Sequence, residues 1–186
     1  MTKEAQDVEK VRRLFRLCPN FPLKGIPFQD VFPVFRDPVA VEIMITHFAQ
    51  HVLSTHKEKI DVVVGLDARG FLLGPLIALR LGASFIPVRK AGKLPGPNIQ
   101  VTYQKEYGPD TFEMNEDAIE PGQNVIIVDD VIATGGSAKA AGQLVEKLNG
   151  NILEYLCLLS AEEVDFSEML GYPVYSMVKV PSTLQE

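Results

Sequence analysis

The chain has 186 residues, of which 46% are hydrophobic, and a formal net charge of -6 at pH 7. This length suits one domain with a buried core, and the net acidity disfavours binding to nucleic acid. Two cysteines exclude a disulfide framework, and neither a signal peptide nor a long apolar span is evident, so we expect reduced thiols in a cytoplasmic protein with no membrane partner.

The N-terminal part of the chain predicts two helices, over Ala5 to Leu17 and from about Pro38 to Thr55. His47 and His51 stand four residues apart on the second helix, a spacing that can place two zinc ligands on one face. However, Phe48 occupies the position at which a zinc protease helix has its Glu, and no third ligand is evident. Core or surface histidines are therefore the better interpretation.

A buried strand is predicted near residues 60–64, followed by a tight turn and a helix from Phe71 to Leu81. The turn places Arg69 at the carboxyl end of the strand. A helix N-terminus together with a guanidinium is a suitable receptor for a pyrophosphate group. The alternative is a surface cation paired with Asp67, because charges beside a tight turn are often only solvated.

The next strand, over Ser84 to Val88, is followed by three cations, Arg89, Lys90 and Lys93. In an acidic chain such a cluster is a candidate receptor for a polyanionic small molecule, and a solvated charge run is the alternative. The repeated Gly and Pro residues from Lys93 to Pro109 predict a long loop, which could act as a lid over the site. Residues 101–103 and 111–114 could form a small antiparallel flap.

The most informative stretch covers residues 125–137. A β-branched run predicts a buried strand, and Asp129 and Asp130 follow at its carboxyl end, where acids can accept hydrogen bonds from a sugar diol. The Gly-rich loop of residues 133–137 opens a helix that ends at Asn149-Gly150, and its N–H groups form an anion site. Two adjacent carboxylates repel each other, which favours a ligand site over an ordinary turn. The unit therefore predicts a site for ribose 5-phosphate.

This stretch resembles the phosphoribosyl pyrophosphate (PRPP) motif of the type I phosphoribosyltransferases, in which an acid pair precedes a Thr-Gly-Gly-Ser loop. Other segments resemble the adenine phosphoribosyltransferases of that family and follow in the same order. These segments are Phe21-Pro22 with Gly25, Phe28 and Asp30; Gly65 to Pro75; Val88 to Gly96; and Glu106-Tyr107-Gly108. The resemblance extends from about Phe21 to about Leu159.

The alternation of strands and helices agrees with the fold that this resemblance implies. We expect an α/β fold with a doubly wound parallel sheet, the type I phosphoribosyltransferase fold, as a single domain over residues 1–186. Residues from about 1 to 37 would form an N-terminal helix and a hood over the base. Residues from about 93 to 114 would form a flexible catalytic loop, and a further strand is expected near 152–159.

The resemblance implies a role for each candidate site residue. The catalytic residues would be Glu106, Arg69 and Tyr107. Ribose 5-phosphate would be bound by Asp129, Asp130, Ala133, Thr134, Gly135, Gly136 and Ser137. Pyrophosphate would be bound by Asp67, Ala68, Arg69, Arg89, Lys90 and Lys93, and adenine by Pro27, Phe28, Gln29 and Val131. Mg²⁺ would be held mainly by PRPP, and no residue is assigned as a direct metal ligand.

The implied reaction transfers the 5-phosphoribosyl group of PRPP to N9 of adenine and yields AMP and pyrophosphate, a step of purine salvage. The resemblance implies a homodimer as well, and a role for Arg89 across its interface. Two departures concern the base: Gln29 stands where the family more often has a basic residue, and Ser160-Ala161 replace a Glu and a bulky aliphatic residue. A phosphoribosyltransferase for a different base, or a diverged non-catalytic paralogue that binds PRPP or a nucleotide, are therefore the alternatives.

Overall fold

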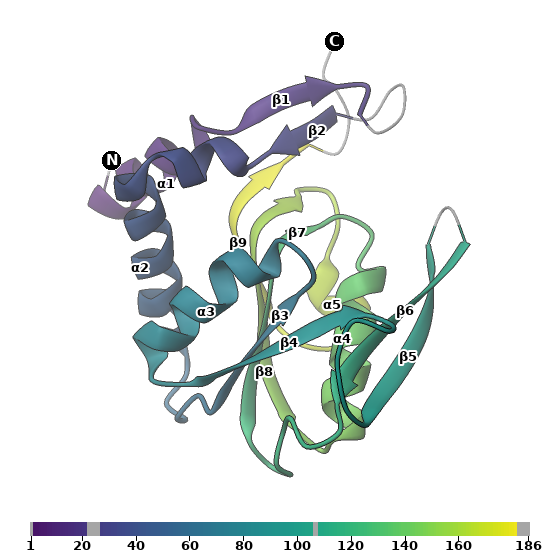
Figure 1. The fold of residues 1–186 in the computed structure, drawn as a ribbon. Helices are drawn as coiled ribbons and strands as arrows, with labels where there is room; N and C mark the ends of the chain where they lie inside the picture. Colours follow the sequence, from purple (N-terminus) through teal and green to yellow (C-terminus); the bar gives the residue numbers. More distant parts are fainter. Residues whose placement is uncertain (1, 22–26, 106–107, 182–186) are drawn as a thin grey trace.

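The computed structural model describes residues 2–21, 27–105 and 108–181. Its helices and strands alternate along most of the chain (Figure 1). In chain order they are α1 Lys3–Arg12, β1 Arg16–Pro19, β2 Pro27–Asp30, the 3-10 helix η1 Phe32–Arg36, α2 Pro38–Thr55, β3 Val62–Leu66, α3 Gly70–Leu81, β4 Ser84–Lys90, β5 Asn98–Lys105, β6 Gly108–Asn115, β7 Asn124–Ile132, α4 Gly136–Lys147, β8 Asn151–Ala161, α5 Phe166–Leu170 and β9 Val174–Val180.

A seven-stranded sheet with the order β5-β6-β4-β3-β7-β8-β9 forms the centre of the molecule. Strands β4, β3, β7, β8 and β9 run parallel to their neighbours in this order. Strands β5 and β6 extend one edge as an antiparallel hairpin, which projects from the sheet beside α4 (Figure 1). The doubly wound parallel sheet predicted from the sequence is thus confirmed.

Two hydrophobic layers enclose the sheet. Alternate side chains of a strand point to opposite faces, and all five residues of β3 are buried. Val62 and Val64 pack in the layer that contains α4, whereas Val63 packs in the layer of α2 and α3. Among the described residues, no helix combines the length and the apolar character that crossing a membrane requires.

The N-terminal helix is shorter than the sequence pattern predicts. Helix α1 ends at Arg12 instead of Leu17, because the chain from Arg16 onward pairs with β2 in a separate two-stranded sheet. The Arg16 guanidinium also lies 2.5 Å from the Asp30 carboxylate of β2. This pairing across the sequence outweighs the local helical pattern, whereas helix α2 has the predicted bounds of Pro38 and Thr55.

Other boundaries shift by a few residues. Strand β3 begins at Val62 instead of residue 60, and β7 continues to Ile132 beyond the run that ends at Val128. Helix α4 ends at Lys147, and Asn149 follows in a left-handed conformation with φ of 59°. Strand β9 and the short helix α5 were not predicted from the sequence. Strand β9 completes the edge of the sheet next to β8, and α5 packs against α4.

Helices α3 and α4 each pack closely against a strand of the sheet. A Cβ atom on Gly70, the first residue of α3, would lie 2.6 Å from the carbonyl oxygen of Val128 in β7. A Cβ atom on Gly142 in α4 would lie 2.0 Å from the Tyr155 hydroxyl in β8. Glycine at these two positions lets both helices approach the sheet, so their N-terminal ends meet at the carboxyl edge of β3 and β7.

Candidate functional site

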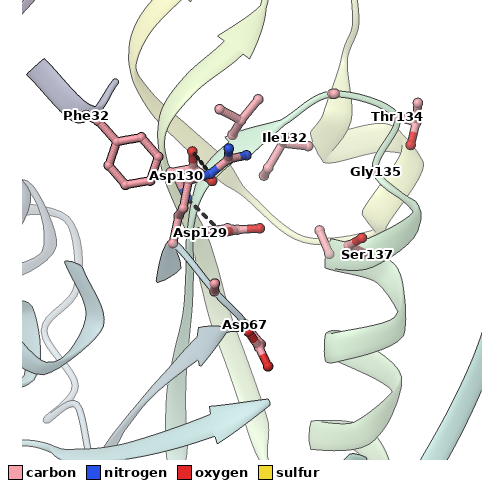
Figure 2. A pocket seen from close by; sticks show the side chains of 13 residues that line it. Phe32, Asp67, Asp129, Asp130, Ile132, Thr134, Gly135 and Ser137 are labelled. Carbon is pink, nitrogen blue, oxygen red and sulfur yellow. Dashed lines mark hydrogen bonds and ion pairs between the residues drawn. The ribbon is translucent and has the colours of Figure 1, made fainter. Parts of the chain in front are cut away.

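A cavity of about 450 Å³ opens at the carboxyl ends of β3 and β7 (Figure 2). Carboxylates, hydroxyls and one guanidinium dominate its lining. The lining residues are Phe32, Asp67, Ala68, Arg69, Asp129, Asp130, Val131, Ile132, Ala133, Thr134, Gly135, Ser137 and Ala138. Residues from the turn after β3, from β7 and from the start of α4 therefore meet in one place, as the sequence predicts for a parallel sheet.

The acid pair lies within β7, not after its last residue, because the strand continues to Ile132. Asp130 is buried with 3% of its surface exposed, and Asp129 is half-buried. The Asp130 N–H donates to Asp129 Oδ1 at 2.9 Å, a contact visible in Figure 2. Burial, followed by the charge of Asp130, raises the pKa of Asp129 well above its ordinary value. An ionised Asp129 is therefore unfavourable next to Asp130 at this edge of the sheet.

Arg69 is the counter-ion of this acid pair. Its Nε atom lies 2.5 Å from Asp130 Oδ2, and its guanidinium carbon lies 5.7 Å from the centre of the Phe28 ring. Asp130 Oδ2 is buried and has no well-aligned hydrogen-bond donor among the described residues, so the contact is an ion pair without good hydrogen-bond geometry. The alternative considered from the sequence, a surface Arg69 paired with Asp67, is wrong, because Asp67 pairs with Arg89.

The loop from Ala133 to Ser137 has the features of an anion site. Gly135 adopts a left-handed conformation with φ of 77° and precedes α4 without a side-chain cap. The first N–H groups of a helix lack partners inside the helix, so an uncapped N-terminus that lines a cavity presents donors to an anion. The Thr134 and Ser137 side chains line the same cavity and add hydroxyl groups.

The turn after β3 contributes a second polar group of residues. Asp67 and Ala68 line the cavity, and the peptide bond between them is cis. Arg89 Nε lies 3.0 Å from Asp67 Oδ2, and Arg89 Nη1 donates to the Lys93 carbonyl oxygen at 3.2 Å. Lys90 Nζ lies 3.6 Å from the Asp110 carboxylate. Strand β4 continues to Lys90, so Arg89 and Lys90 are its last residues and only Lys93 of the three predicted cations follows it. Arg89 is linked to a cavity residue, whereas Lys90 and Lys93 are exposed outside the lining.

A buried carboxylate that was not predicted from the sequence supports the turn after β4. Glu113 of β6 accepts hydrogen bonds from the backbone N–H groups of Lys93 and Leu94, both at 2.8 Å, and from the Gln100 amide at 3.2 Å. Burial alone would raise its pKa, but these donors outweigh burial and hold the pKa of Glu113 below its ordinary value. A Glu in an alternating strand pattern gives no signal for this role.

The base side of the cavity is only partly as predicted. Val131 lines it, and Phe28 contacts Arg69 at its rim. Gln29 lines a different cavity together with Arg12 and Leu17, since neighbouring side chains of a strand point to opposite faces. Phe32 is 52% exposed and lines the candidate site, and it was not predicted. In the sequence, the only indication that Phe32 could belong to the site is an aromatic side chain next to a strand.

Three predicted residues cannot be placed in this cavity. Glu106 and Tyr107 lie outside the described residues, as does the segment with Pro22 and Gly25. Pro27 begins β2, but its side chain is not among those described. These assignments remain predictions.

The histidines of α2 have structural partners. His47 Nε2 lies 2.5 Å from the Tyr175 hydroxyl, and His51 Nε2 lies 3.0 Å from the Glu154 carboxylate. Burial lowers the pKa of His47. Within the described part of the chain, no cluster of three or more His, Cys, Asp or Glu side chains could hold a metal ion. The interpretation of these residues as core or surface histidines agrees with their contacts.

Similarity to known proteins agrees with the chemistry of this cavity. A family model described as a phosphoribosyl transferase domain matches residues 37–166. An adenine phosphoribosyltransferase of Yarrowia lipolytica is 50% identical over 170 residues, which cover 91% of this chain and 93% of the relative. Adenine phosphoribosyltransferase 1 of Saccharomyces cerevisiae is 52% identical over 175 residues, or 94% of each chain.

A solved structure with a similar fold carries two ligands. It is the adenine phosphoribosyltransferase of Saccharomyces cerevisiae in complex with adenine and D-2,5-dideoxy-2,5-imino-altritol 1,6-bisphosphate. Its TM-score with this chain is 0.90 at 47% sequence identity, and the match covers 94% of this chain and 99% of that chain.

The raised pKa of Asp129 gives a prediction about stability. The folded state favours the protonated carboxyl, so stability is lost as pH rises from about 4 through the raised pKa. Asp129→Asn removes this loss and should raise the melting temperature of the free protein at pH 7.5, by about 2–4 °C per kcal/mol of relieved repulsion. The difference from the unmodified protein should shrink toward pH 4, which circular dichroism can measure.

Asp61→Asn is the matched control. Asp61 lies before β3, and the backbone N–H of Asn124, followed by Lys59, lowers its pKa. This variant should therefore be less stable than the unmodified protein at pH 7.5. A loss of stability in Asp129→Asn at pH 7.5 would contradict the proposed repulsion.

Proposed function

The chain belongs to the phosphoribosyltransferase family and, within it, to the adenine phosphoribosyltransferases, and on this basis we propose that the cavity at the ends of β3 and β7 binds PRPP and adenine. The enzyme transfers the 5-phosphoribosyl group of PRPP to N9 of adenine and produces AMP and pyrophosphate. We assign each part of the substrates to residues below. The reaction serves purine salvage.

The observation that carries the assignment is the junction of β7 and α4. Asp129 and Asp130 accept hydrogen bonds from the ribose diol, and the loop from Ala133 to Ser137 binds the 5-phosphate. Both groups line one cavity, so a single ribose 5-phosphate can contact them together. This arrangement supports PRPP as the sugar donor.

The turn after β3 receives the pyrophosphate. Asp67, Ala68 and Arg69 line the cavity, and the N-terminus of α3 begins at Gly70. Arg89 is held next to Asp67 and would supply a further guanidinium, whereas Lys90 and Lys93 would act from outside the lining. Positive charge on this side stabilises the charge that develops on the leaving group.

Magnesium is the proposed cofactor and fits the donors that are present. The carboxylates of Asp67, Asp129 and Asp130 line the cavity and are of a type that Mg²⁺ accepts, but these described residues do not form a cluster that could hold the ion by themselves. Most of its ligands would come from oxygens of PRPP and from water. When bound, the ion neutralises part of the pyrophosphate charge.

Adenine would bind between the β2 segment and Val131. Phe28 and Phe32 contribute aromatic surface at this side, and Gln29 would act through its backbone only, since its side chain lines another cavity. Glu106 would assist at the purine ring while N9 attacks C1 of the ribose, with Tyr107 beside it. Catalysis would come mainly from positioning and from electrostatic stabilisation.

The domain organisation belongs to the same proposal. Residues 1–186 form one catalytic domain, in which residues 1–37 provide the helix and hood and residues 93–114 provide the catalytic lid. The lid would exclude water while the ribosyl centre is reactive. The two free cysteines, Cys18 and Cys157, support a cytoplasmic location, because neither forms a disulfide.

The homodimer has support in an apolar face of α3. Leu72, Leu76 and Leu79 are 38%, 39% and 78% exposed, and Val39 at the start of α2 is 57% exposed. Leu76 and Leu79 line one surface depression with Pro38, Val41 and Ile45. Large apolar side chains gathered on one helix face are typical of an interface. The guanidinium carbon of Arg89 lies 6.0 Å from the centre of the ring of Phe71, which belongs to α3. This contact supports a site near the subunit interface.

Turnover with different bases tests the proposed function. The protein is incubated with PRPP, Mg²⁺ and adenine, hypoxanthine, guanine or orotate, and nucleotide products are separated by chromatography. We expect AMP from adenine only. Asp130→Asn should lower kcat/KM for PRPP by about tenfold or more, because a diol acceptor loses its charge. Asp117→Asn, at an exposed acid outside the cavity, should leave turnover unchanged.

Two outcomes would overturn the assignment. Turnover with another base would make the enzyme a phosphoribosyltransferase of different specificity. Binding of PRPP without any turnover would favour a non-catalytic paralogue.

Sedimentation velocity tests the dimer. We expect a mass of twice 20.5 kDa for the unmodified protein. Leu79→Asp places a charge in the apolar face and should give monomers, whereas Leu53→Asp should not. Leu53 is 65% exposed on α2 and lies about 21 Å along the helix from Val39. A monomeric unmodified protein at micromolar concentration would contradict the proposal.

A further inference from the structure

Strand β5 is attached to α4 at both ends of the helix. At the C-terminal end, the Lys147 ammonium donates to the carbonyl oxygen of Gln100 at 2.7 Å. At the N-terminal end, the Ser137 hydroxyl donates to the Tyr103 hydroxyl at 3.2 Å. A Cβ atom on Gly136 would lie 3.5 Å from the Gln104 carbonyl oxygen, so backbones also approach closely here. The hairpin therefore rests on the helix that begins with the phosphate loop.

The ring of Tyr103 is positioned by the hairpin itself. It packs against Phe112 of β6 with 5.0 Å between ring centroids, and the residue is half-buried. The neighbouring Thr102 and Thr111 hydroxyls contact each other at 2.9 Å, and Thr102 is exposed. Alternation along the strand thus directs Tyr103 toward α4 and Thr102 away from it.

Ser137 can serve two partners at once. Its hydroxyl has one hydrogen to donate and lone pairs to accept with, and its side chain lines the candidate phosphate cavity. The backbone N–H of Ser137 is one of the first in α4, so it can donate to a phosphate oxygen while the hydroxyl keeps its hydrogen bond to Tyr103. A phosphate bound in this way fixes Ser137 and, through the Ser137 hydroxyl, the contact with Tyr103.

We infer that Tyr103 is a positioning residue that couples the 5-phosphate loop to the catalytic hairpin through Ser137. This inference rests on the proposed function, which makes the loop from Ala133 to Ser137 the phosphate site. Phosphate binding strengthens the Tyr103–Ser137 contact and so fixes strand β5 against α4. Glu106 follows three residues after Tyr103 in the sequence, and the family resemblance gives it the catalytic role.

The inference differs from a purely structural role of the tyrosine. If the hydroxyl only stabilised the hairpin, its removal would lower stability without selectivity among ligands. Coupling through Ser137 instead predicts weaker binding of ligands with a 5-phosphate, unchanged binding of adenine, and no effect once Ser137 has lost its hydroxyl.

Calorimetric titration with ribose 5-phosphate tests the coupling. Tyr103→Phe keeps the ring on Phe112 and removes only the hydroxyl, so we expect binding about two- to tenfold weaker, as for one lost hydrogen bond. Thr102→Val removes one hydroxyl of the Thr102–Thr111 contact in the same hairpin. This control variant should bind ribose 5-phosphate as the unmodified protein does. The melting temperatures of both variants are compared to detect loss of folding.

The decisive comparison uses Ser137→Ala as a background. Tyr103→Phe should cause no further loss of ribose 5-phosphate affinity in that background. Unchanged affinity in the single variant, or the same loss with and without Ser137, would overturn the inference. Absence of AMP synthesis in the unmodified protein would instead count against the proposed function, and the titration would still decide the role of Tyr103.

Discussion

The repulsion between Asp129 and Asp130 is the constraint on which the site depends. Two adjacent carboxylates in a buried strand are unfavourable, and burial together with this repulsion raises the pKa of Asp129. Arg69 offsets part of the cost through its ion pair with Asp130. It also contacts Phe28, so one guanidinium connects the turn after β3, the end of β7 and the N-terminal segment. A ribose diol that takes over the carboxylates would release Arg69 for a new partner.

The sheet topology explains why a single cavity can serve the whole substrate. Parallel strands β3 and β7 are neighbours, so the turn that holds Asp67 and the loop that ends at Ser137 open at the same edge. Both α3 and α4 begin there, so their positive N-terminal ends lie at the same edge. The antiparallel hairpin of β5 and β6 lies against α4, beside the loop proposed for the 5-phosphate.

Local sequence patterns were sufficient for the central elements. The β-branched run, the acid pair and the Gly-rich loop predicted the β7–α4 unit, because burial periodicity and backbone freedom are local properties. Contacts between distant segments were not predictable in this way. The pairing of Arg69 with Asp130, the support of the β4 turn by Glu113 and the early end of α1 depend on which segments meet in three dimensions.

The most direct test of the central claim compares two sugar phosphates that differ in one hydroxyl. Calorimetry would give the dissociation constants of ribose 5-phosphate and 2-deoxyribose 5-phosphate for the same protein. If Asp129 and Asp130 accept hydrogen bonds from the diol, the deoxy compound should bind about tenfold more weakly or worse, since a hydrogen bond to a charged group contributes about 1.5–3 kcal/mol. Equal dissociation constants would contradict the assignment of the acid pair to the ribose.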